Sequence, residues 1–148
     1  MQARMNVAKA ASDAYKALRT LEDHLASSPL PKSTQHLVKL RVSQINGCAF
    51  CVSLHSREAR AEGETEERIW SVATWREAPF YTDEERAALA LAEAATRIAD
   101  NPAGVPDDVW NDAADHYDEE TLAALVMTIA SINALNRIGV TVRKPAAA

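Results

Sequence analysis

The sequence NGCAFCVSLH, residues 46–55, holds both cysteines of the protein and one of its four histidines. Its opening Asn-Gly pair is a typical chain break, and the residues that follow favour helix, so Cys48 is predicted in the first turn of a new helix. At about 100° per residue, Cys48, Cys51 and His55 then fall within an arc of roughly 60°. We therefore expect two sulfurs and an imidazole on one face of this helix.

Composition indicates an ordinary globular protein with a preference for helix. Apolar residues make up 47% of the 148 residues and charged residues 25%, and there are only four glycines. A chain of this length buries roughly two-thirds of its unfolded surface, which is enough for a real hydrophobic core. We expect one domain, residues 1–148.

Apolar periodicity and capping signals predict about seven helices. A regular seam of apolar residues along residues 6–26 predicts a long first helix that is suited to packing against another helix, including one from a second subunit. The later helices are predicted to begin at or just after residues that favour helix starts, which are Ser33, Thr65, Thr82, Pro106 and Asp118. No stretch shows sustained alternation of apolar and polar residues, so the predicted fold class is all-α, a helical bundle.

Glycines and the last residues mark the predicted ends of elements. Gly63 and Gly139 are predicted to end helices, because glycine is favoured just beyond a last helical turn. Residues 144–148 are predicted to form a frayed tail.

Charge and hydropathy argue against several classes of partner. The formal net charge of −5 leaves no basic patch for nucleic acid. No apolar run approaches the length of a bilayer span, and the N-terminal residues lack the apolar core of a signal peptide. We therefore expect a cytoplasmic protein that binds neither nucleic acid nor membrane. In that compartment a CxxC pair is more often catalytic or metal-binding than a structural disulfide.

The cysteine and histidine face is suited to thiol redox chemistry. A helix N-terminus lowers the pKa of a cysteine, and Cys48 gains most from this effect. His55 follows Cys51 by one turn, close enough to take the thiol proton. The two-residue gap lets the sulfurs form a disulfide with little backbone change. Together these features predict a peroxide-reducing cycle in which a sulfenic acid forms, condenses with the second cysteine and is recharged by an external dithiol.

Two other interpretations of the same residues stay open. Cys48 and Cys51 lie on an apolar stripe and could be core residues of a non-catalytic helical oligomer. With His55 they could also supply three of four zinc ligands. Three ligands from two turns of one helix fit a closed zinc site poorly, and no second CxxC or HxxxH pair completes it.

Residues 37–48, together with the CxxC pair and His55, resemble the alkylhydroperoxidase D-like branch of the carboxymuconolactone decarboxylase family. Residues 75–89 and 132–137 resemble the following segment and the last-helix signature of that family, so the core motif region of the resemblance is residues 37–137. The resemblance implies an all-α fold, assembly as trimers or hexamers, and reduction of hydroperoxides by thiols. It implies no bound cofactor, and an external dithiol or lipoyl-type reductant. The wider family also suggests an alternative, a lyase that would not need the thiols.

By the same resemblance Cys51 is the peroxidatic cysteine, Cys48 its resolving partner and His55 the proton acceptor. The family has a glutamate twelve residues before the first cysteine, where this sequence has His36. In the family that carboxylate joins the proton relay. A histidine there could act as base or donor, or could break the relay, or could simply occupy the first turn of a helix. The candidate catalytic residues are therefore Cys48, Cys51, His55 and His36.

Overall fold

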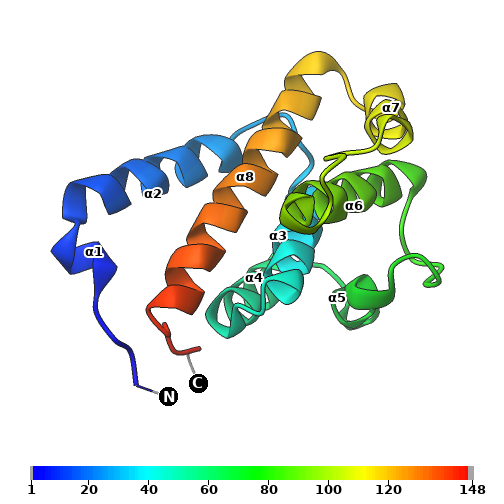
Figure 1. Cartoon of the computed structure of the whole chain (residues 1–148). Coiled ribbons are helices and arrows are strands. Elements are labelled where there is room, and N and C mark those ends of the chain that lie inside the picture. Colours follow the sequence, from blue (N-terminus) through cyan, green and yellow to red (C-terminus); the bar gives the residue numbers. More distant parts are fainter. Residues whose placement is uncertain (1, 147–148) are drawn as a thin grey trace.

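The computed structural model describes residues 2–146, and every regular element within them is helical (Figure 1). In chain order these elements are α1 (Val7–Ala10), α2 (Ser12–Ala26), α3 (Lys32–Ile45), α4 (Ala49–Ala61), α5 (Glu66–Ser71), the 3₁₀ turn η1 (Val72–Thr74), α6 (Asp83–Thr96), the 3₁₀ turn η2 (Ile98–Asp100), α7 (Asp107–His116) and α8 (Glu119–Thr141). The all-α prediction is confirmed, with eight α-helices in the described residues where about seven were expected.

The bundle is built around α3, which packs against α4, α6 and α8. Val38 and Val42 of α3 meet Leu91 of α6 and Ile132 of α8 in a core whose members are almost fully buried. On the far side of α8, α1 and α2 extend away from the other helices (Figure 1), and α2 packs on α8. This hydrophobic core therefore lies where α3, α6 and α8 pack together.

Three of the predicted helix starts are confirmed by hydrogen bonds. The side chains of Thr65, Thr82 and Asp118 each accept a bond from the backbone N–H three residues later. At Thr82 the bond is reciprocated by Glu85, which completes a capping box. Gly63 follows the end of α4 with a φ of +92°, a conformation that glycine adopts without a steric cost.

Other predicted boundaries were wrong. α3 begins at Lys32, directly after Pro31, so Ser33 lies inside its first turn rather than at the cap. Proline suits this position because the first N–H groups of a helix have no partner within the helix. The predicted first helix over residues 6–26 is interrupted at Ala11, which has φ −130° and ψ 55°. Its seam is buried only at Leu25 and exposed near Ala11. The predicted packing of this seam against a second subunit remains a prediction.

The hydropathy of α8 requires a correction to the sequence analysis. By length and composition alone this helix, with a mean hydropathy of 1.4, would be able to cross a membrane. Leu125, Ile129 and Ile132 on its inner face are instead buried against the other helices of the bundle. In the part of α8 that meets this criterion, 39% of the residues are buried in the bundle. The expected cytoplasmic location remains a prediction.

The chain after α8 was predicted to be a frayed tail. Residues 144–146 form no helix. Within them, the ammonium group of Lys144 lies 3.7 Å from the centre of the Phe50 ring of α4, a cation–π contact. Residues 147 and 148 of the predicted tail lie outside the described residues.

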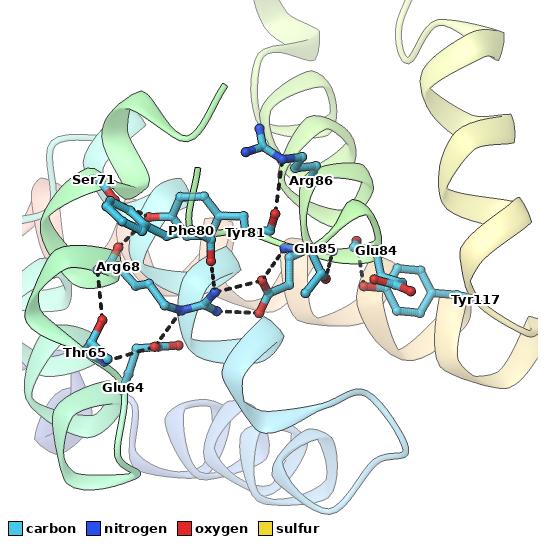
Figure 2. Close-up of polar contacts among 11 residues, drawn as sticks. Glu64, Thr65, Arg68, Ser71, Phe80, Tyr81, Glu84, Glu85, Arg86 and Tyr117 are labelled. Carbon is cyan, nitrogen blue, oxygen red and sulfur yellow. Dashed lines mark hydrogen bonds and ion pairs between the residues drawn. The ribbon is translucent and has the colours of Figure 1, made fainter. Parts of the chain in front are cut away.

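A buried ion network fastens α5 to α6 (Figure 2). The guanidinium of Arg68 donates to Glu64 at 2.7 Å, to both carboxylate oxygens of Glu85, and to the backbone carbonyl of Phe80. The Tyr81 hydroxyl donates to the Arg68 carbonyl at 2.6 Å. Because Glu85 also caps α6, the network joins the start of that helix to α5 and to the loop between them.

Candidate functional site

The two cysteines lie at the start of α4. Gly47 has a φ of +68°, so the chain turns there in a conformation that favours glycine. Cys48 was predicted in the first turn of this helix and is its N-cap residue, directly before that turn. Its Sγ accepts a hydrogen bond from the Cys51 N–H at 3.3 Å. Cys48 and Cys51 are joined by a disulfide, with Cα atoms 5.3 Å apart. The site is therefore described in its oxidised state.

Gly139 of α8 packs directly against this disulfide. A Cβ atom at this position would lie 3.1 Å from Cys48 Sγ and 3.8 Å from Cys51 Sγ. The first distance is tighter than ordinary van der Waals contact, so an alanine would force the sulfur to move. The prediction that Gly139 ends the helix was wrong, because α8 continues to Thr141. This glycine gives the sulfurs room instead.

A cavity of about 630 Å³ opens beside the disulfide, between the α1–α2 arm and helices α3, α4 and α8. Cys51, His55 and His36 all line it, whereas Cys48 does not. Both cysteines are buried, Cys48 with 2% and Cys51 with 5% of its surface exposed. Much of the apolar wall comes from α4 and α8, with Phe50, Leu54, Leu135 and Ile138. Cys51, His55 and His36, three of the four predicted site residues, thus line one cavity. The fourth, Cys48, is joined to Cys51 by the disulfide.

His55 is held by a carboxylate on its own helix. Its Nδ1 lies 2.8 Å from Oε2 of Glu58, three residues later. The hydrogen bond from His55 is the main reason that the pKa of Glu58 lies below its ordinary value, although partial burial acts in the opposite direction. An ionised carboxylate can only accept, so Nδ1 carries the hydrogen and Nε2 of the neutral ring is left as the acceptor.

His36 lies on α3, and its ring has a buried nitrogen, Nδ1, that has no hydrogen-bond partner among residues 2–146. Burial lowers the pKa of His36, the charges of Lys39 and His55 lower it further, and Glu58 and Glu62 offset part of that shift. The ring is therefore favoured in its neutral form near pH 7, which can take up a proton.

Sequence reasoning missed a buried ion pair at the same cavity. Glu22 of α2 and Lys39 of α3 are 2.8 Å apart, and the Ser131 hydroxyl of α8 donates to the other oxygen of Glu22 at 2.5 Å. Burial acts to raise the pKa of Glu22, but the charge of Lys39 and the hydrogen bonds from Lys39 and Ser131 outweigh it and hold that pKa below its ordinary value. The pair ties three helices together beside His55.

We expect Glu22→Gln to lower the free energy of unfolding by about 2 kcal/mol at neutral pH, because Lys39 loses its opposite charge. A carboxyl group whose pKa is lowered by folding adds stability that is complete above its ordinary pKa of 4.5 and is lost as the pH falls through the folded pKa. Wild-type stability should therefore decrease with falling pH below about 5, and part of this decrease should be missing in the variant.

Urea unfolding followed by circular dichroism at several pH values would measure both effects. Asp23→Asn is a matched control, since Asp23 is the exposed neighbour of Glu22. A double replacement, Glu22→Leu with Lys39→Met, should recover much of the lost stability, because an apolar pair leaves no buried charge unpaired. An identical pH dependence in wild type and Glu22→Gln would contradict the prediction.

A family model matches the segment of the chain that carries this site. The model for the carboxymuconolactone decarboxylase family matches residues 12–94, more than half of the chain, including both cysteines, His36 and His55. The chain belongs to the carboxymuconolactone decarboxylase family. This membership confirms the resemblance found in the sequence.

Other proteins are similar to this carboxymuconolactone decarboxylase family member over nearly its whole length, in sequence or in fold. The uncharacterised protein YdfG of Bacillus subtilis is 40% identical over 147 residues, 99% of both chains. A crystal structure from Agrobacterium tumefaciens, described as a protein of unknown function and a candidate antioxidant defence protein AhpD, is 41% identical with a TM-score of 0.94 over 99% of both chains. The debrominase Bmp8 has the same fold, with a TM-score of 0.82 at 23% identity over 95% of this chain and 74% of its own.

Glu58, Glu22 and Lys39 were not predicted as residues of the site, and only the first of them could have been predicted from a local pattern. Glu58 follows His55 by three positions on one helix, a spacing that places two side chains side by side, so it could have been found. Glu22 and Lys39 meet across two helices, and no local pattern indicates their contact. Within residues 2–146 no group of three or more His, Cys, Asp and Glu side chains is placed to hold a metal ion.

Proposed function

We propose that this protein reduces hydroperoxides through a Cys48–Cys51 disulfide cycle that an external dithiol recharges. One observation carries the proposal: Cys51 lines a cavity together with His55, and its disulfide partner Cys48 does not line that cavity. The family membership and the name of the Agrobacterium structure support the same chemistry.

In the first step the reduced Cys51 is the nucleophile. His55 takes the thiol proton, and the Cys51 thiolate attacks the terminal oxygen of the hydroperoxide. The O–O bond breaks as the S–O bond forms, so Cys51 is oxidised to a sulfenic acid and the hydroperoxide is reduced to an alkoxide. The proton held by His55 passes to the alkoxide, which leaves as an alcohol. In this proposal the neutral His36 is a second proton acceptor at the same cavity.

In the second step Cys48 resolves the sulfenic acid. The Cys48 sulfur attacks Cys51 Sγ, the S–O bond breaks, and the hydroxyl group leaves as water with the Cys48 proton. A dithiol then attacks the disulfide, and two exchanges return both cysteines to thiols and leave the reductant as a disulfide. The sum is one hydroperoxide and one dithiol converted to one alcohol, one water and one disulfide.

The position of Cys48 at the N-cap suits the recharging step. A dithiol in the cavity reaches Cys51 Sγ, so Cys48 is the leaving group. The thiolate of Cys48 is stabilised by the N–H of Cys51 and by the positive end of α4. A better-stabilised thiolate leaves faster in disulfide exchange.

The cavity also bears on the partners of the reaction. Its volume is within the range of small-molecule sites, and its apolar wall suits a hydroperoxide with an organic body. We further propose that the reaction needs no bound cofactor, that the reductant is a dithiol or lipoyl-type thiol, and that the chain works in the cytoplasm as a trimer or hexamer.

The direct test is a peroxide-consumption assay with a dithiol as the reductant. We expect cumene hydroperoxide to be consumed continuously with dithiothreitol or dihydrolipoic acid, and much more slowly with an equal concentration of thiol groups from a monothiol. Mass spectrometry of alkylated samples should show Cys48 and Cys51 alternating between disulfide and free thiols. Peroxide that is not consumed, with both cysteines unchanged, would remove the proposal.

A further inference from the structure

His55 lies among several titratable groups that come from three helices. Its own helix contributes Glu58, whose carboxylate is 2.8 Å from Nδ1. Helix α3 contributes His36 and Lys39, which act electrostatically on Glu58. Helix α2 contributes Glu22, whose pKa is lowered in part by the charge of His55. These groups have unequal access to the imidazole.

Two of the nearby carboxylates already have other partners. Glu22 forms an ion pair with Lys39 and accepts a hydrogen bond from Ser131. The positive charge of Lys39 therefore offsets most of the electrostatic effect of Glu22 on His55. Glu62, the residue that directly follows the end of α4, lies 4.0 Å from the ammonium group of Lys32. Within the described residues Glu58 forms no ion pair with a lysine or an arginine. Its carboxylate is hydrogen-bonded to the imidazole of His55.

We infer that Glu58 is a positioning residue of this site, one that orients His55 and stabilises the imidazolium formed when Cys51 gives up its proton. This inference rests on the proposed function. The Nδ1–H bond to Glu58 fixes the tautomer in which Nε2 is the proton acceptor. It also keeps the ring from turning, as the carboxylate does in other carboxylate–histidine–nucleophile sites.

The exposure of Glu58 sets the size of the expected effect. Its side chain is 45% exposed, whereas that of His55 is 7% exposed. Water therefore screens the carboxylate, and its removal should cost less than the roughly 10⁴-fold loss seen where such a carboxylate is fully buried. We expect a loss of about ten-fold in the reactivity of the Cys51 thiol at neutral pH.

Iodoacetamide alkylation measures this reactivity without any peroxide. The rate constant for Cys51 is measured across pH in reduced Cys48→Ser protein, with and without Glu58→Gln. We expect Glu58→Gln to be about ten-fold slower at pH 7, with the midpoint of its pH profile about one unit higher. Glu62→Gln is the matched control, since Glu62 directly follows the same helix and lines the same cavity, and it should stay within about twofold of the parent.

The outcomes separate this inference from the proposed function. A Glu58→Gln profile that overlies the parent profile, or a Glu62→Gln variant that slows Cys51 equally, would overturn the role of Glu58, even if the wild type consumes peroxide. A shifted profile supports the role even if the wild type consumes none, which would remove only the proposed function. Because Glu58 is half exposed, a circular dichroism spectrum suffices to check that the variant is folded.

Discussion

Replacing Cys51 by serine is expected to abolish hydroperoxide reduction, with a loss on the order of 10³-fold or more. The serine hydroxyl at this position is a far weaker nucleophile than a thiolate, and the other cysteine of the chain, Cys48, does not line the cavity. The first turnover should be lost as well as the steady state. The measurement is peroxide consumption with excess dithiol, together with a single-turnover experiment on pre-reduced protein.

Cys48→Ser is the matched control and should behave differently. The variant keeps Cys51 and His55 at the cavity, so reduced protein should consume a single equivalent of peroxide and gain the mass of one oxygen atom at Cys51. Continuous turnover with a dithiol should then be slow, because the disulfide cannot form. The opposite pattern, in which Cys51→Ser keeps the first turnover and Cys48→Ser loses it, would reverse the two roles.

Replacing Arg68 by methionine is expected to lower the free energy of unfolding by about 3 kcal/mol. The substitution leaves Glu64 and Glu85 with unpaired charges that are about nine-tenths buried. For a protein of this size that loss corresponds to a decrease in melting temperature of roughly 10 °C. Thermal unfolding followed by circular dichroism would measure it. None of these residues lines the cavity, so Cys51 alkylation at low temperature should be unchanged.

Arg60→Met provides the comparison for a surface ion pair. Arg60 pairs with Glu66 in an exposed position, where solvent screens both charges. Its replacement should leave the melting temperature nearly unchanged. If Arg68→Met has no larger effect than Arg60→Met, the network shown in Figure 2 does not hold α5 to α6.

The parts of the fold that could be predicted are those set by neighbours in the chain. Thr65, Thr82 and Asp118 were identified as caps because each cap bond closes within three residues. The helical period likewise predicts that Cys51 and His55, four residues apart, lie on the same side of α4. The misplaced start of α3 shows the limit of such signals, since Ser33 and Pro31 both suit a helix start and lie two residues apart.

The sequence by itself determined the helical class, several helix starts, and the placement of Cys51 and His55 one turn apart on the same helix. These follow from periodicity and from hydrogen bonds between residues a few positions apart. Only the tertiary structure decided that Glu22 meets Ser131, 109 positions away, and that Gly139 makes room for the disulfide. It also decided that Cys51 faces the cavity while Cys48 does not. These properties depend on which helices pack together, and packing is settled by the shapes of whole helix faces rather than by any local pattern.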